Sequence, residues 1–142
     1  MRTFSASIDI AASPDAVWAV WQDVARWPEW TASMTSVEVV SGTPLDVGTK
    51  VRIVQPRLKP VVMTITDAVL HRRFAWASQQ PGLRAFADHV LEPKGQGVRV
   101  TLSVAFSGAL STIVGWAFGR LTQRYVEMEA AGLKRRAESL TP

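Results

Sequence analysis

The sequence predicts an α+β fold. It consists of a curved antiparallel sheet of about seven strands, a long C-terminal helix across it, and two short helices after the first strand. Apolar and polar residues alternate along residues 3–10, which is typical of a strand with one buried face. Short β-branched and aromatic runs, separated by glycine and proline, then fill residues 37–106. After Ser107-Gly108 the apolar period changes from two residues to 3.6 and continues to about Glu138.

Helix-start signals follow the first strand directly. Ser13 can cap a helix, Pro14 suits its first position, and Asp15 lies at the positive end of its dipole. This helix is expected to stop before Pro28, because the residue that precedes a proline avoids the helical region. Residues 26–30 are then expected to form a tight turn or a second short helix.

Tryptophans crowd this early segment. Trp18, Trp21, Trp27 and Trp30 carry more aromatic surface than a short helical segment can bury alone. A second apolar surface must therefore cover them, and the strands that follow are expected to supply it.

The middle of the chain is expected to form the rest of the sheet. The sequence predicts strands at residues 37–40, 50–55, 61–70, 74–78, 83–92 and 98–106. Gln80-Pro81-Gly82 and the Pro93–Gly97 segment read as turns. Consecutive strands pair as hairpins by default, so the sheet should be antiparallel, with one face buried.

A long amphipathic helix is predicted to close the chain. At ~1.5 Å per residue it would be about 40 Å long and would cross the curved sheet, leaving a cavity that one helix cannot fill. Gly115, Gly119 and Gly132 each cost about 1 kcal/mol relative to alanine, which points to close packing or to room for a ligand. The expected buried stripe is Ile113, Val114, Ala117, Leu121, Tyr125 and Met128.

Composition limits the classes of function. The length of 142 residues predicts one domain, residues 1–142. Without cysteine there is no thiolate zinc site and no cysteine nucleophile. The start has no signal-peptide pattern, and no apolar run reaches the ~18 residues of a membrane span, so a cytoplasmic protein is expected. The net charge is +4, but the basic residues are scattered, so no nucleic-acid partner is expected.

Short motifs occur in a fixed order along nearly the whole chain. They are Ile8-x-Ile10-x2-Ser13-Pro14-x2-Val17-Trp18, Asp23-Val24-x2-Trp27-Pro28-x-Trp30, Val47-Gly48-Thr49, Gln55-Pro56, Phe74-x-Trp76, Leu91-Glu92-Pro93 and Phe106-Ser107-Gly108. Together they resemble the START-like, or SRPBCC, superfamily, in particular its polyketide cyclase/dehydrase and lipid-transport branch. The resemblance implies a helix-grip fold with a deep apolar cavity between sheet and C-terminal helix. It implies no single activity, since members include cyclases, hydrolases and lipid carriers.

Strand parity selects candidate cavity residues. His89 shares a strand face with Ala87, and an imidazole there could act as a base or a hydrogen-bond partner; alternatively, a neighbouring hydroxyl satisfies it. Gln55 shares a face with Ile53 and could orient a ligand carbonyl or hydroxyl, or could secure the turn before Pro56. The expected ligand-binding residues that line the cavity are His89, Gln55, Trp76, Phe74, Tyr125, Ile53, Met63, Ala87, Leu102, Val104, Phe118 and Leu121.

Two functions remain open at this point. One is binding or carriage of a hydrophobic small molecule such as a lipid, polyketide or aromatic compound. The other is catalysis by a polyketide cyclase/aromatase or dehydratase, for which His89, Gln55 and Tyr125 are the candidate polar groups. No cofactor and no metal are expected, because the only histidines, His71 and His89, lie on different strands.

Further partners follow from the charge pattern. The basic helix end, Lys134-Arg135-Arg136, complements the helix dipole and could touch a membrane surface transiently. The chain is expected to be a monomer or a homodimer. Ligand identity and turnover are not encoded in any motif of this sequence.

Overall fold

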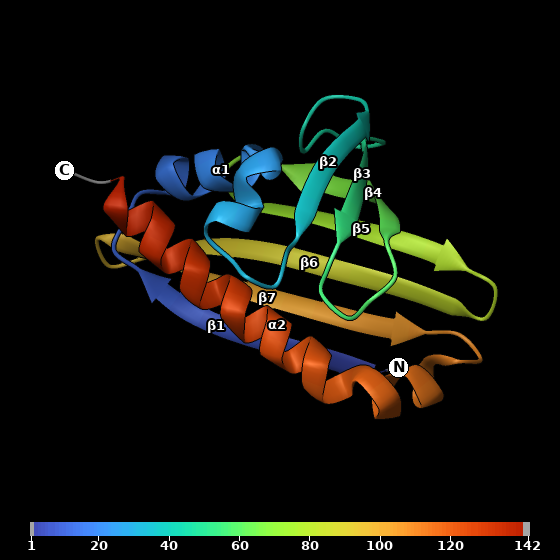
Figure 1. Ribbon diagram of the computed structural model, residues 1–142. Helices are drawn as coiled ribbons and strands as arrows, with labels where there is room; N and C mark the ends of the chain where they lie inside the picture. The colour runs from blue at the N-terminus through green and yellow to red at the C-terminus, as the bar shows by residue number, and fades with distance from the viewer. Residues whose placement is uncertain (1, 141–142) are drawn as a thin grey trace.

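A computed structural model describes residues 2–140 and shows an α+β helix-grip fold (Figure 1). This confirms the predicted fold class and the predicted order of elements. Met1 and residues 141–142 of the predicted domain lie outside the described residues. The elements are β1 (Arg2–Ile10), α1 (Pro14–Gln22), the 3₁₀ helix η1 (Val24–Glu29), β2 (Ser36–Ser41), β3 (Lys50–Val54), β4 (Val61–Val69), β5 (Arg73–Gln80), β6 (Leu83–Lys94), β7 (Gly97–Ser107) and α2 (Ser111–Ser139).

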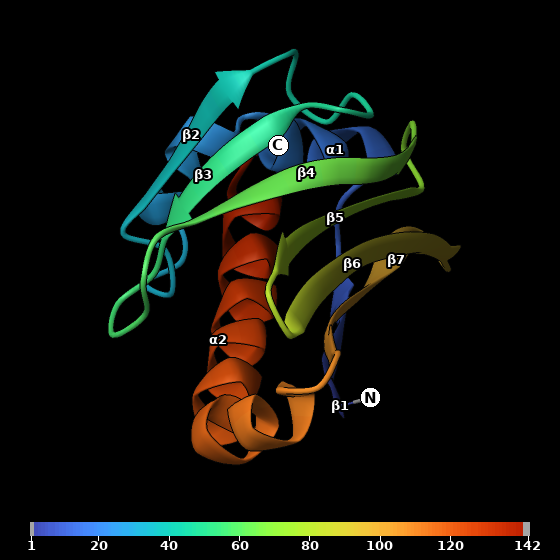
Figure 2. The same ribbon diagram turned by 90° about the vertical axis from the view of Figure 1, so that its right-hand side faces the viewer.

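The strands form one antiparallel sheet that curves around α2. Its order is β1-β7-β6-β5-β4-β3-β2, so every neighbouring pair except β1–β7 is consecutive in the chain. Figure 2 shows the sheet bending so that β2, β3 and β4 arch over the later turns of α2. Register shifts at Val39/Ser41 and Ile65/Asp67 add to this curvature, because a bulge bends and twists its strand.

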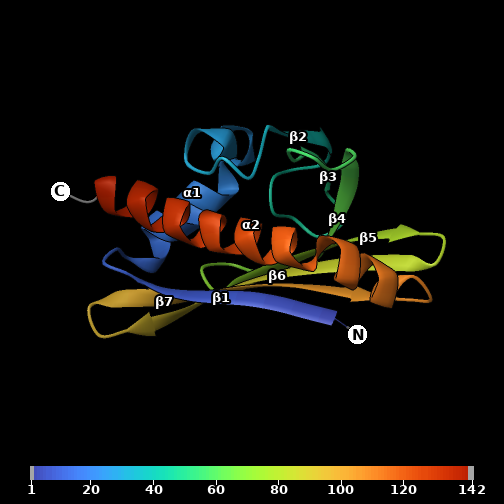
Figure 3. The same cartoon turned by 60° about the horizontal axis from the view of Figure 1, so that its bottom comes forward.

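The early tryptophans pack against the inner face of β5. Trp21 and Trp27 are fully buried, and their ring centroids lie 5.3 and 6.4 Å from that of Phe74. The indole Nε1 of Trp27 donates to the Trp21 carbonyl at 3.0 Å, so η1 is tied back to α1. Ser13 caps α1 as predicted, by accepting from the Ala16 amide. Figure 3 shows α1 beside the C-terminal half of α2, where these helices close one end of the fold.

The face that α2 buries differs from the predicted stripe. Ile113 is 63% exposed, and Ala117 is exposed as well. Glycines face the sheet there instead: a Cβ on Gly115 would lie 2.7 Å from Cγ of Arg2, and one on Gly119 would lie 3.1 Å from Cζ of Phe4. The helix approaches β1 closely, so a larger residue at either position would have to displace the side chain of Arg2 or Phe4. Of the predicted stripe, Tyr125 is the residue that is buried, and it is joined by Gly115, Gly119, Val126, Glu129, Ala130, Leu133 and Ala137.

Gly132 is the tightest glycine contact of α2, and it gives a test of this packing. A Cβ there would overlap the backbone carbonyl oxygen of Trp30, which follows η1. Gly132→Ala is expected to lower the free energy of unfolding by about 1–3 kcal/mol, because overpacking outweighs the ~1 kcal/mol gain in helix propensity. Gly119→Ala is the matched control. Its nearest neighbour is the movable ring of Phe4, so we expect little loss.

Urea denaturation of the two variants measures the difference. Equal stabilities would contradict a rigid backbone contact at Gly132.

Candidate functional site

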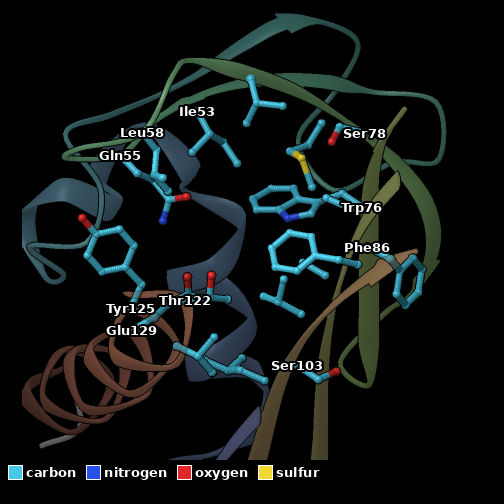
Figure 4. A pocket seen from close by; sticks show the side chains of 18 of the residues that line it. Ile53, Gln55, Leu58, Trp76, Ser78, Phe86, Ser103, Thr122, Tyr125 and Glu129 are labelled. Atoms are coloured by element: carbon cyan, nitrogen blue, oxygen red, sulfur yellow. The ribbon is translucent and has the colours of Figure 1, made fainter. Parts of the chain in front are cut away.

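A pocket of about 210 Å³ lies between the inner face of the sheet and α2 (Figure 4). Its walls come from β3, the β3–β4 loop, β4 to β7, and one face of α2. The walls are mainly apolar, with Trp76, Met63 and Leu102 among them. The volume is below the ~300–1,000 Å³ of pockets that take drug-sized ligands, so the enclosed space suits a small molecule.

Most of the predicted cavity residues line this pocket. Lining it are His89, Gln55, Trp76, Tyr125, Ile53, Met63, Ala87, Leu102 and Val104. Their contact with a ligand stays a prediction.

Three of the predicted residues, Phe74, Phe118 and Leu121, do not line the pocket. Phe74 lies behind it, fully buried, with its ring stacked on His89 at 3.9 Å between centroids. Phe118 is 41% exposed and Leu121 is half-buried, because the glycine contact with β1 rotates α2 away from the predicted orientation. That rotation turns Thr122, Tyr125, Val126 and Glu129 toward the pocket instead.

A histidine–carboxyl pair joins the sheet to the helix at the pocket. Nε2 of His89 lies 3.5 Å from Oε2 of Glu129, and the side chains are 3% and 12% exposed. Nδ1 of His89 lies 3.3 Å from the Phe74 carbonyl oxygen. A carbonyl oxygen can only accept, so Nδ1 carries a hydrogen and Nε2 is the atom that faces Glu129.

The interaction between the two side chains depends on one further proton. An unprotonated Nε2 and a carboxylate oxygen would both present lone pairs and repel each other. A proton on either partner, as imidazolium with carboxylate or as imidazole with carboxylic acid, makes the contact attractive. In both forms the pair has no net charge, which reduces the free-energy cost of burying the two side chains in an apolar pocket. The pair can therefore give or accept a hydrogen bond at the pocket wall.

Glu129 was not among the residues that the sequence singled out. A neighbouring hydroxyl was one of the alternatives for His89, whereas the structure places a backbone carbonyl and a carboxyl group beside it. A signal was available, since Glu129 follows Tyr125 by four residues and therefore shares its helix face. Within residues 2–140, no cluster of three or more His, Asp or Glu side chains could hold a metal ion.

The β3–β4 loop borders the pocket opposite Trp76. Figure 4 shows Gln55, Leu58 and Tyr125 together on that side. The Tyr125 hydroxyl donates a hydrogen bond to the Pro56 carbonyl, so the loop is fastened to α2. Gln55 also supplies its own carbonyl to the Leu58 amide at 3.2 Å. The loop is thus held over the pocket by hydrogen bonds that can open locally.

Tyr125→Phe tests this fastening. Losing the hydroxyl is expected to speed amide hydrogen exchange at residues 57–59, while global stability falls by only about 1 kcal/mol, as for one hydrogen bond. Thr122→Val is the matched control, because the Thr122 hydroxyl bonds within α2 to the Phe118 carbonyl. Unchanged loop exchange in Tyr125→Phe would mean that the loop is held by other contacts.

A helix-grip fold with an apolar pocket beneath its long helix defines a START-like protein. The chain belongs to the family described as polyketide cyclase / dehydrase and lipid transport, whose sequence profile matches residues 1–138. This confirms the resemblance seen in the sequence motifs. No curated protein sequence matches the chain.

Solved structures share the fold at low sequence identity. A protein from Thermus thermophilus is 21% identical, with a TM-score of 0.77 over 99% of this chain and 100% of that one. A START superfamily protein from Mycobacterium smegmatis is 16% identical, with a TM-score of 0.78 over 98% and 99%. The di-domain ARO/CYC of the BE-7585A biosynthetic pathway is 21% identical, with a TM-score of 0.73 over 97% of this chain and 47% of that one. These likenesses show the fold alone.

Proposed function

We propose that this protein binds and carries a small hydrophobic molecule that has one carbonyl or hydroxyl group. The apolar body of the ligand lies against Trp76, Met63 and Leu102, and its oxygen reaches His89 and Glu129. The observation that supports this most directly is the buried His89–Glu129 pair in a pocket that is otherwise mainly apolar. Family membership is consistent with a hydrophobic ligand.

The two parts of the pocket contribute differently to binding. Apolar surface removed from water supplies most of the affinity, at about 25 cal/mol per Å². The polar pair supplies orientation, because a ligand oxygen placed elsewhere would be left without a partner. A hydrogen bond of this kind contributes about 0.5–1.5 kcal/mol, which corresponds to at most about tenfold in affinity.

Two matched probes test this proposal. 1-Naphthol and 1-methylnaphthalene have the same shape, but only naphthol has a hydroxyl group. Isothermal titration calorimetry is expected to show 1-naphthol binding up to about tenfold tighter, by one hydrogen bond. The double variant His89→Phe/Glu129→Leu removes both polar partners together, so neither is left buried and unpaired. This variant should bind 1-naphthol no tighter than 1-methylnaphthalene, because the naphthol hydroxyl then has no partner.

Ser78 offers a control variant for this experiment. Ser78→Ala removes a pocket hydroxyl outside the pair and should keep the preference for 1-naphthol. Equal affinities in the native protein would exclude the pair as an anchor. Failure of both probes to bind would count against this pocket as the binding site for small aromatics.

A second candidate function is acid–base catalysis on the bound molecule. It is favoured by the proximity of an imidazole and a carboxyl group, those of His89 and Glu129, at the pocket wall. A suitable assay is loss of water from 4-hydroxy-4-phenylbutan-2-one. A base takes the proton next to the carbonyl, an acid protonates the departing hydroxyl, and a conjugated enone forms. Its ultraviolet absorbance should grow faster with native protein than with Glu129→Gln; a rate equal to that in buffer would leave carriage as the function.

A further inference from the structure

One end of the molecule brings together the segments that border the pocket. The β5–β6 turn contacts the start of α2, where the Leu110 amide donates to the Gly82 carbonyl at 2.8 Å. Leu83, the first residue of β6, and Leu58 on the β3–β4 loop both line the pocket. Figures 1 and 2 show the start of α2 at this end, away from the arch of β2, β3 and β4.

Large apolar side chains are exposed on the first turns of α2 and just before them. The exposed fractions are 44% for Leu110, 63% for Ile113, 82% for Trp116 and 41% for Phe118. The glycines of α2 face β1, so these residues have no sheet to cover them. Single exposed leucines are ordinary, but several large apolar side chains exposed within residues 110–118, a tryptophan among them, are typical of an interaction surface. We refer to Leu110, Ile113, Trp116 and Phe118 as the apolar tip.

The chain segments around this end are rich in cations. Residues 2–8, 53–66, 78–87 and 101–126 contain neither Asp nor Glu. Among the described residues, none of the cations in these segments forms an ion pair, and all of them are exposed. They are Arg2, Arg57, Lys59, Arg84, Arg120 and Arg124.

The opposite end of α2 is less suited to an anionic partner. The sequence suggested Lys134-Arg135-Arg136 as a membrane contact. In the structure Lys134 pairs with Glu138 at 2.6 Å, and Arg136 pairs with Glu29 at 2.8 Å. Their charges are already compensated locally, whereas those around the apolar tip are not.

We propose that the apolar tip and its surrounding cations dock on an anionic lipid bilayer surface, which brings the pocket end toward the membrane. Tryptophan and aliphatic side chains favour the interfacial region of a bilayer, where the indole keeps contact with water. Each arginine or lysine near anionic headgroups adds to the attraction. The evidence for docking is the exposed surface alone. That docking helps a ligand to enter the pocket rests in addition on the proposed function.

Charge argues against a second copy of this chain as the partner. A symmetric dimer through the apolar tip would place the same surface on both sides and bring its unpaired cations together. Like charges facing each other oppose association. An anionic lipid bilayer would neutralise these cations. Because it is fluid, it accepts protruding side chains without a preformed complementary pocket.

Vesicle sedimentation tests the proposal. The native protein should sediment with vesicles of phosphatidylglycerol and phosphatidylcholine, less with phosphatidylcholine alone, and less as salt increases. Trp116→Ala should weaken binding about tenfold or more, because a large apolar side chain no longer inserts. Leu70→Ser, at a 66% exposed residue of the β4–β5 turn, is the matched apolar control and should bind as the native protein does.

Charge variants separate headgroup attraction from insertion. Arg120→Gln/Arg124→Gln should lower affinity for the anionic vesicles and flatten its salt dependence. Arg135→Gln, an exposed cation at the other end of α2, should change little. Equal losses from Trp116→Ala and Leu70→Ser would overturn the proposal, as would binding that ignores lipid charge.

Two further results have distinct meanings. No vesicle binding, or a concentration-dependent dimer in sedimentation equilibrium that Trp116→Ala abolishes, would overturn docking in favour of a protein partner. Trp116→Ala should bind 1-naphthol in solution like the native protein, since Trp116 does not line the pocket. Vesicle binding without naphthol binding would therefore reject the proposed function and leave docking intact.

Discussion

The close approach of α2 to β1 determines how the rest of the molecule is arranged. Gly115 and Gly119 let the helix lie against Arg2 and Phe4, and Gly132 lets it pass the Trp30 carbonyl. These contacts fix the rotation of the helix about its axis. With that rotation set, Tyr125 and Glu129 face the pocket while Trp116 faces outward. Each glycine lowers helix propensity by about 1 kcal/mol, and close packing of α2 on its neighbours offsets this loss. The same rotation of α2 about its axis forms the pocket wall and leaves the apolar tip exposed.

The polar pair at the pocket depends on both sides of the fold. His89 is held by stacking on Phe74 and by its hydrogen bond to the Phe74 carbonyl, since β5 and β6 place these residues opposite each other. Glu129 arrives from α2, far along the chain. Each group alone would be an isolated buried polar side chain, which is expensive, whereas here each has the other as a polar neighbour at 3.5 Å. The pair thus also ties helix and sheet together at the pocket.

The sequence predicted the strands well, because alternation reports directly which face of a strand is buried. Ala87, His89, Leu102 and Val104 were placed on the inner face by parity, and they line the pocket. Phe86, Asp88 and Ser103, which have the opposite parity, border it as well. The rotation of the long helix could not be obtained in the same way. An apolar stripe normally indicates which face of a helix is buried. In α2, however, the face that carries the glycines packs on the sheet, and large residues such as Ile113 are left exposed. Phe118 was misplaced for that reason, whereas Glu129 could have been found from its position four residues after Tyr125.

The direction in which a ligand lies follows from the positions of these groups along α2. Glu129 lies about one turn beyond Tyr125, away from the start of the helix. His89 contacts the buried aromatic cluster of Trp21 and Trp27, at ring distances of 5.8 and 6.0 Å. In the proposed binding mode an oxygen that reaches this pair would point inward. The apolar remainder would extend toward the β3–β4 loop, which is hydrogen-bonded to α2 through Tyr125. A hydrophobic molecule entering from a membrane at the apolar tip would thus enter polar group first, and its apolar part would leave the bilayer last.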